Sequence, residues 1–390
     1  MKLAAALSLL VGLSSFAFSQ EFTSGSDGSD GDLSLGSDSS RTLQVPEDGI
    51  FNFGTVTLGA RSNLYFIANR ANTPIYILAE GDVNLGGRIH VSAPSNMNRP
   101  QAGLGAPGGG FAGGTGGENP GDGLGPGGGK GGTEGSGSVY RGSGSYASRG
   151  TVAQTLTTNG EIYGNPLLIP LIGGSGGGGS TNGFGGAGGA GAICIASTTK
   201  ITCNWNSYYQ VPLFNAIGGA SNSGTGSGSG GAVRLVAPDV SGTALFNLSG
   251  GNTSYAGYGR ARIDSLNPSQ FSLAASNSNS YITFGNNMVV FPPEGPSIRI
   301  TEAAGRTIAP EVTDPVFVLL PVGAPSEQTV TLSVTDFGTV VPLRVTVTPE
   351  QGEKATYDTT IDNTAGGTTS GSVTVQIPAG TSTRVDAWTR

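Results

Sequence analysis

The sequence predicts an all-β protein that has two parts, a Gly-rich body of the β-solenoid or parallel β-helix kind and a C-terminal β-sandwich. Three observations predict this fold class. Short segments alternate apolar and polar residues, the period of a half-buried strand, while helical periodicity is nearly absent. An apolar-x-apolar pattern recurs along the first three quarters of the chain. Glycine is very frequent, at 69 of 390 residues, but its excess ends before a C-terminal segment of ordinary composition.

The N-terminus has the features of a secretory signal peptide. Residues 1–19 begin with a basic Lys2, continue with an apolar run from Leu3 to Val11, and end in small residues before a predicted cleavage after Ser19. No other segment approaches the roughly 20 apolar residues of a membrane span. We therefore expect a secreted protein, located outside the cell, at the cell surface or in the periplasm.

Residues 20–41 form an acidic Ser/Gly/Asp segment. Evenly spaced acids are typical calcium ligands. However, a calcium-loop frame that starts at Asp27 or Asp30 lacks the required glycine at position six and glutamate at position twelve. The composition instead predicts a flexible, solvated segment.

Residues 42–292 contain the repeat. Three segments, 74–93, 192–205 and 232–251, share the order apolar-x-apolar, a turn, and a further apolar residue. This alignment matches Ile75, Ile77 and Val83 with Ile193, Ile195 and Ile201, and then with Val233, Leu235 and Val240. Strands that recur with a fixed inward face indicate a β-solenoid, in which each coil buries its apolar edge on the next. An irregular β-sandwich with long loops is the alternative.

A Gly-rich insert occupies residues 103–150, where 22 of 48 residues are glycine. Ordering such a backbone costs about 1 to 2 kcal/mol per residue, more than its few large apolar side chains can return. The insert is therefore either mobile, or held by backbone hydrogen bonds between extended segments of the polyproline II type.

The short alternating segments in residues 294–390 predict a β-sandwich of the immunoglobulin or fibronectin type, with Trp388 in its core. The segment has its own set of alternating apolar residues, so we expect it to fold independently. Seven strands are expected, at 297–303, 315–321, 328–337, 339–349, 354–363, 371–378 and 381–389.

Two Gly-rich matches to functional motifs lack their structural context. Gly103–Gly108 fits G-x-G-x-x-G and Gly173–Gly177 fits G-x-S-x-G, but neither is followed by a predicted helix. The single histidine, His90, lies between Ile89 and Val91 and is expected to face outward. We expect no cofactor and no metal site, because one histidine and two cysteines show no ligand spacing.

Cys194 and Cys203 are the only cysteines, an even number in an exported chain, which favours a disulfide. The solenoid register opposes this pairing, since it aligns Cys194 with outward Tyr76 and Cys203 with inward Leu85. A hairpin that turns at residues 197–200 would place the two sulfur atoms within bonding range. We predict the disulfide on the hairpin geometry.

The runs "DGIFNFGTVTL", "NLYFIANRANTPIYILAEGDVNLGGRIHVSA" and "GGAGAICIAS" resemble a widespread type of exported, Gly-rich bacterial protein of uncharacterised function. More loosely, the chain is similar to the pectin-lyase-like parallel β-helix proteins, which implies polysaccharide cleavage or adhesion. The polygalacturonase-type signatures Asn-Thr-Asp, Asp-Asp, Gly-His-Gly and Arg-Ile-Lys are missing, and Arg262-Ile263-Asp264 only approaches the last of them.

These features predict an exported, non-catalytic structural or adhesive protein of the cell surface or extracellular matrix, with glycans as the partner class. Low charge and a net charge of −7 disfavour nucleic acid. The alternative is a polysaccharide lyase or hydrolase with Asp239 and Asp264 as an acid/base pair. Ice binding is disfavoured because the repeat has no fixed threonine column. The sequence leaves the ligand, any catalysis and the oligomeric state open.

Overall fold

The computed structural model describes residues 22–390 apart from 98, 133–141, 151–158, 210, 222–224, 253–254, 268–269, 292–295, 311, 313–314 and 390. The predicted signal peptide and the predicted boundary at Pro292-Pro293 lie outside the described residues. The all-β class is confirmed, because the described elements are strands and one 3-10 turn, Asn279–Tyr281. No helix in this part of the chain is long and apolar enough to cross a membrane.

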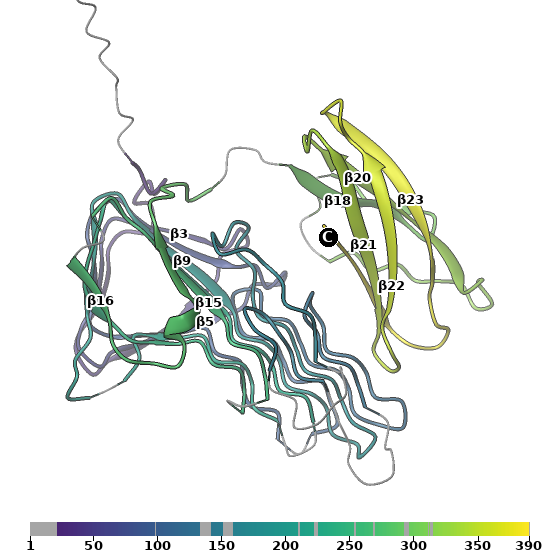
Figure 1. The fold of residues 1–390 in the computed structure, drawn as a ribbon, viewed down its shortest axis with the longest axis horizontal. Coiled ribbons are helices and arrows are strands. Elements are labelled where there is room, and N and C mark those ends of the chain that lie inside the picture. The colour runs from purple at the N-terminus through teal and green to yellow at the C-terminus, as the bar shows by residue number, and fades with distance from the viewer. Residues whose placement is uncertain are drawn as a thin grey trace, which may run out of the picture.

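Three parallel sheets form the body, at the left of Figure 1. From β1 to β16 each sheet takes every third strand of the sequence, except that the second sheet ends at β14, so the chain visits the three sheets in turn. The first sheet contains β1 (Leu33–Leu35), β4 (Val56–Leu58), β7 (Val83–Leu85), β10 (Lys200–Asn204), β13 (Asp239–Ala244) and β16 (Phe271–Leu273). The second contains β2 (Ser40–Gln44), β5 (Asn63–Ile67), β8 (Arg88–His90), β11 (Phe214–Asn215) and β14 (Phe246–Asn247). The third contains β3 (Ile50–Phe53), β6 (Ile75–Ala79), β9 (Ala192–Ser197), β12 (Ala232–Val236), β15 (Arg260–Asp264) and β17 (Ile282–Gly285).

The strand register confirms the repeat found in the sequence. Ile193 lies opposite both Ile75 and Val233, and Ile195 lies opposite Ile77 and Leu235. In the first sheet, Ile201 lies between Val83 and Val240. The aligned positions are buried in one hydrophobic cluster that the three sheets share, so each strand places its apolar side chains beside those of its neighbour in the sheet.

Residues 22–41 differ from the predicted flexible segment, since they carry β1 and β2, which pair with β4 and β5. Leu33 and Leu35 are buried in the shared cluster. The acidic side chains act locally: the carboxylate of Asp32 accepts hydrogen bonds of 2.8 Å from the backbone N–H and the hydroxyl of Thr55. Two buried leucines, together with aspartates that accept backbone hydrogen bonds, therefore order this stretch.

The Gly-rich segments pack against one another beside the body, where Figure 1 shows them as traces running side by side. Segment 173–180 lies at the centre of this arrangement. Its backbone bonds recur at every third residue, as when Gly174 and Gly177 donate to the carbonyls of Ala190 and Ala187 at 2.7 and 2.9 Å. Three residues is the turn of a polyproline II helix. Among the described residues, its backbone hydrogen-bonded neighbours lie in residues 111–117, 121–124, 129–132, 142, 183–184, 187–190 and 226–229.

Close approach of backbones explains why glycine fills this bundle. A Cβ atom added at Gly177 would lie 2.2 Å from the backbone of Gly226, and one added at Gly176 would lie 2.0 Å from the carbonyl of Ala112. No side chain fits at those distances without moving a neighbouring segment. Of the two alternatives left by the sequence, the structure shows the hydrogen-bonded one for the described part of the insert.

We expect Gly177→Ala to destabilise the protein, because the added methyl group meets backbone that cannot rotate away. The expected loss is about 1–3 kcal/mol or more, measured as the midpoint of denaturant unfolding. Hydrogen exchange should also show that the protected amides of segment 173–180 become exchangeable. Gly36→Ala is the matched control, since a Cβ there meets nothing within 4 Å. Fast exchange of this segment in the wild type would contradict the packed bundle.

The C-terminal part contains two antiparallel sheets around a separate hydrophobic cluster. One sheet has the order β19-β18-β20-β23 and the other β22-β21-β24. Independent folding of this part stays a prediction. Its strands are β18 (Ser297–Ala303), β19 (Arg306–Thr307), β20 (Glu327–Thr335), β21 (Val340–Pro349), β22 (Ala355–Asp362), β23 (Thr368–Gln376) and β24 (Thr383–Thr389).

Two predictions for this part are wrong. Residues 315–321 form no strand, since Pro315 and Pro321 at its ends lack the amide donors of a ladder. Trp388 does not join the core, because Val385 and Ala387 take the inward positions of β24. Its ring instead meets Phe111 of the Gly-rich segments edge-on, with centroids 5.9 Å apart.

Hydrogen bonds also join the C-terminal part to the Gly-rich bundle. Lys354 donates its backbone N–H to the carboxylate of Asp122 at 3.0 Å and its Nζ to the carbonyl of Gly128 at 2.6 Å. Burial raises the pKa of Asp122 and lowers that of Lys354.

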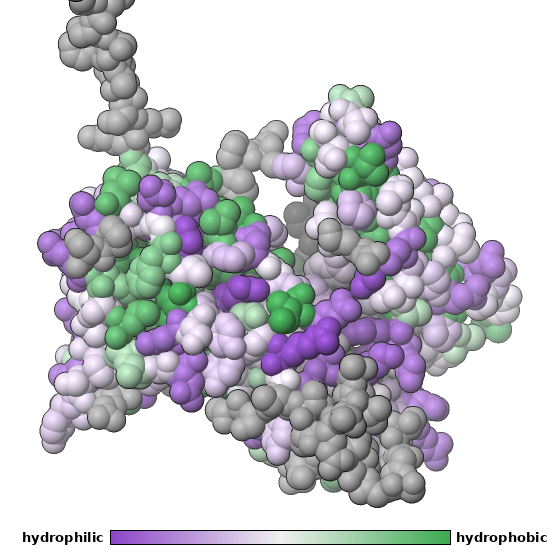
Figure 2. Space-filling model, viewed as in Figure 1, coloured by the Kyte–Doolittle hydropathy of each residue, from purple (hydrophilic) through white to green (hydrophobic). Residues whose placement is uncertain are grey.

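Figure 2 shows hydrophobic and hydrophilic residues mixed over the visible face of both parts, which matches the low charge of the chain.

The predicted disulfide between Cys194 and Cys203 is absent, and both residues are free thiols. Cys194 lies opposite Tyr76 on the outer face of the third sheet, whereas Cys203 lies opposite Leu85 in the shared inner cluster. The hairpin geometry is wrong because β9 and β10 belong to different sheets. The chain adopts the repeat register, which places the two cysteines on opposite faces and so prevents the disulfide.

Both thiols should resist alkylation in the native protein. Burial raises the pKa of Cys194 and of Cys203 to about 12, so little of the reactive thiolate exists at pH 8. We expect no labelling by a thiol reagent at pH 8 in buffer, and two labelled thiols per chain in denaturant without reductant. A denatured chain with no reactive thiol would show that the disulfide forms after all.

Candidate functional site

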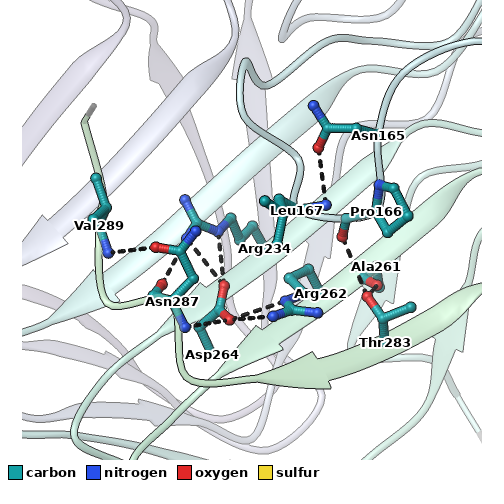
Figure 3. A network of polar contacts seen from close by, with 10 residues as sticks. All are labelled: Asn165, Pro166, Leu167, Arg234, Ala261, Arg262, Asp264, Thr283, Asn287 and Val289. Carbon is teal, nitrogen blue, oxygen red and sulfur yellow. Dashed lines mark hydrogen bonds and ion pairs between the residues drawn. The ribbon is translucent and has the colours of Figure 1, made fainter. Parts of the chain in front are cut away.

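The two carboxylates considered for acid/base chemistry occupy different sheets. Asp239 begins β13 in the first sheet, and Asp264 ends β15 in the third. Asp264 is fully buried and binds two arginines: Arg234 Nη2 lies 3.0 Å from Asp264 Oδ2, and Arg262 Nη2 lies 2.8 Å from Oδ1 (Figure 3). The backbone N–H of Asn287 adds a bond of 3.0 Å to Oδ1.

This arrangement makes Asp264 a structural anion. Its two oxygen atoms are occupied by charged and backbone donors, and none of its surface reaches solvent. Arg234, only 1% exposed, also donates to the carbonyl of Asn287 at 2.9 Å, which ties β12 to the segment after β17 (Figure 3). A carboxylate held in this way has no position from which to exchange a proton with a substrate, so the proposed acid/base pair with Asp239 is not formed.

Asp264→Asn should strongly destabilise the fold, because it leaves buried Arg234 without its counter-charge. Breaking a buried pair in this way costs about 3–5 kcal/mol. Asp82→Asn is the control, since Asp82 pairs with Lys200 at 3.2 Å on the surface, where such a pair contributes about 0–1 kcal/mol. Denaturant unfolding of both variants measures the difference, and equal effects would contradict the structural role.

The other residues that the sequence motifs singled out are also held in contacts with the rest of the protein. Ser175 of the G-x-S-x-G match is buried inside the Gly-rich bundle, where its hydroxyl accepts the N–H of Gly127 at 3.0 Å. His90 faces outward as predicted, stacks on Tyr65 at 4.4 Å, and has its pKa lowered to about 4, chiefly by burial. Within the described part of the chain, no three His, Cys, Asp or Glu residues group as metal ligands.

Two cavities differ in what lines them. The larger, about 670 Å³, lies mostly in the C-terminal part, with Ala71 of the body also lining it, and its walls are mainly aliphatic side chains such as Ile300, Val318 and Val330. The charged groups of Arg384 and Asp386 on its wall pair with each other at 2.9 Å. The smaller, about 260 Å³, combines aromatic, amide and guanidinium groups at a corner of the body. A few convergent polar groups on an apolar surface are typical of ligand sites, which favours the smaller cavity.

We call this smaller cavity the corner groove, and define it by lining residues within the stretches 57–61, 84–88 and 204–213. These stretches are the three successive connections from the first sheet to the second, β4 to β5, β7 to β8 and β10 to β11. The turns stack because β4, β7 and β10 are in parallel register, with Thr57 opposite Asn84. The third turn is longer, since β10 ends at Asn204 and β11 begins only at Phe214. Its extra residues build one wall of the groove.

Aromatic rings form that wall. The Nε1–H of Trp205 donates to the carbonyl of Val211 at 3.0 Å, which closes the loop, and its ring packs partly on the core of the body. Tyr209 is 39% exposed in the groove, and neighbouring Tyr208, 85% exposed, meets it edge-on at 5.1 Å. Exposed rings on a loop that is closed in this way offer a fixed apolar surface.

Arg61 fixes the position of Tyr209. Its guanidinium lies 4.7 Å from the ring centroid, donates to the Tyr209 hydroxyl, and forms an ion pair with Asp38. The bond to Arg61 lowers the pKa of Asp38, so the pair stays charged at neutral pH. Arg61 is therefore occupied by protein groups and acts as a support for the aromatic wall.

Amide side chains supply hydrogen-bonding groups around the rings. Asn84, Asn204 and Asn206 line the groove, and an amide carries both donors and an acceptor, although the Asn206 oxygen already accepts the backbone N–H of Tyr208 at 2.8 Å. Aromatic faces suit the C–H face of a sugar ring, and amides suit its hydroxyl groups. The arrangement can therefore bind a ligand that has one apolar face and a polar edge.

Sequence reasoning missed this groove. The signal was present in "NWNSYYQV", residues 204–211, where three aromatic residues and two asparagines lie at and just beyond the end of the second repeat segment, 192–205. Placing these residues beside Arg61 and Asn84 required knowledge that turns from distant stretches stack. Comparison of the chain with protein-family models, with curated proteins and with solved structures gives no match.

Proposed function

We propose that this chain is an exported, non-catalytic structural or adhesive protein of the cell surface or extracellular matrix, and that it holds glycans in the corner groove. The body is proposed to be a β-solenoid and the C-terminal part a β-sandwich of the immunoglobulin or fibronectin type. The observation that carries the glycan proposal is the combination of exposed Tyr209, ordered Trp205 and three amide side chains in one cavity.

Other observations support the proposal. The predicted N-terminal signal peptide supports export, and the recurrence of every third strand in the same parallel sheet from β1 to β15 supports a solenoid. Two antiparallel sheets around one cluster support a sandwich. The similarities to Gly-rich exported bacterial proteins and to the pectin-lyase-like group remain expectations. The alternative, a polysaccharide-degrading enzyme, is less well supported. Its candidate acid/base residue Asp264 forms ion pairs with Arg234 and Arg262 through its carboxylate.

The test is binding of the full chain to an array of plant and bacterial polysaccharides, followed by affinity measurements on the best binder. Tyr209→Ala should weaken binding about fivefold to tenfold, the size of an aromatic contact of about 1–1.5 kcal/mol. Tyr255→Ala is the matched control, because Tyr255 is an exposed tyrosine, 52% accessible, that does not line the groove.

Equal loss of binding in both tyrosine variants, or binding that neither variant affects, would contradict the corner groove as the glycan site. A reducing-sugar assay on the same polysaccharides tests the non-catalytic part of the proposal. Release of reducing ends by the wild type, beyond that of a heat-inactivated sample, would show that the protein is an enzyme.

A further inference from the structure

The corner groove contains a cation that the described part of the protein does not neutralise. Arg88, at the start of β8, lines the groove, and its side chain forms no hydrogen bond or ion pair with the described residues. Its Nε atom is buried without a partner. A guanidinium has five N–H donors and stays charged at all ordinary pH values, so leaving it unpaired carries a cost in stability.

Two described acidic residues that come shortly before groove-lining residues in sequence or pair with one are already engaged. Asp38 pairs with Arg61, and Asp82 pairs with Lys200. No carboxylate is among the residues that line the groove, whose charged side chains are Arg61 and Arg88. The charge of Arg88 also reaches His90, where it adds to burial in lowering the pKa of the imidazole. The groove is therefore locally positive in a chain that is acidic as a whole.

We propose that the corner groove selects anionic sugars, with Arg88 as the residue that binds a carboxylate or sulfate group on the sugar. This inference rests on the proposed glycan-binding function and names its ligand class. An arginine fork matches a carboxylate or a sulfate with two parallel hydrogen bonds, which gives a direction as well as a charge. The sugar ring then lies against Tyr209 and Trp205, and its hydroxyl groups reach the asparagines.

The preference for anionic sugars comes from direct contact within the groove. The net charge of −7 repels anions at long range, so the preference depends on direct contact with Arg88 rather than on general attraction. A neutral sugar can still use the aromatic and amide groups. The charged and uncharged forms of one sugar should thus bind at the same place with different affinities.

The experiment compares three disaccharides that share one skeleton: cellobiose, its glucuronosyl analogue with a carboxylate at C6, and cellobiose with a sulfate ester at C6. Affinities are measured for the full chain by ligand-observed NMR titration at low salt. We expect at least one charged form to bind about tenfold or more tightly than cellobiose, and the stronger of the two identifies the anion.

Arg88→Gln should reduce this ratio to about one, while Arg88→Lys should keep part of the preference. Arg299→Gln is the matched control, because it removes the same charge from an exposed position on β18 in the C-terminal part. A circular dichroism melt of each variant checks that the fold is kept.

Two results would overturn the inference. Cellobiose binding that depends on Tyr209, with no preference for either charged form, would leave the glycan proposal standing and remove the anion preference. A preference that Arg88→Gln retains, or that Arg299→Gln removes equally, would also assign it to something other than Arg88. Absence of binding by all three sugars would overturn both the inference and the glycan proposal on which it rests.

Discussion

The in-register stacking of parallel strands is the constraint on which the rest of the structure depends. Each strand must place its apolar residues beside those of the previous strand in the same sheet, so every turn recurs at the same corner. The long connections all run from the second sheet to the third, at residues 91–191, 216–231 and 248–259. They therefore leave the body side by side, and their glycines can bond to one another.

Two kinds of packing hold the protein together as a result. In the body and in the C-terminal part, buried aliphatic side chains supply the stabilisation. In the Gly-rich bundle, side chains are almost absent, and backbone hydrogen bonds at every third residue connect the segments. The bundle needs the body, because a single Gly-rich segment has no apolar face to bury. It also provides the surface on which Lys354 and Trp388 of the C-terminal part rest.

The same register accounts for the corner groove. Turns between the first and second sheets stack at another corner of the body, and a single longer turn after β10 is enough to add an aromatic wall. Groups from stretches far apart in sequence, such as Arg61, Arg88 and Tyr209, then meet in one cavity. The scaffold keeps their spacing fixed because each turn is anchored by a strand on both sides. A site of this kind suits recognition of an extended ligand on the surface of a rigid body.

The sequence by itself determined the all-β class, the inward positions of the repeat and the outward direction of His90, because strand alternation is local and the repeat aligns equivalent positions. It also determined that Cys194 and Cys203 lie on opposite faces in the repeat register. Only the tertiary structure decided that no disulfide forms, that the Gly-rich insert is packed, that Asp264 is locked between two arginines, and that Trp388 faces Phe111. Those outcomes depend on which distant segments become neighbours, and alternation within one segment carries no information about that.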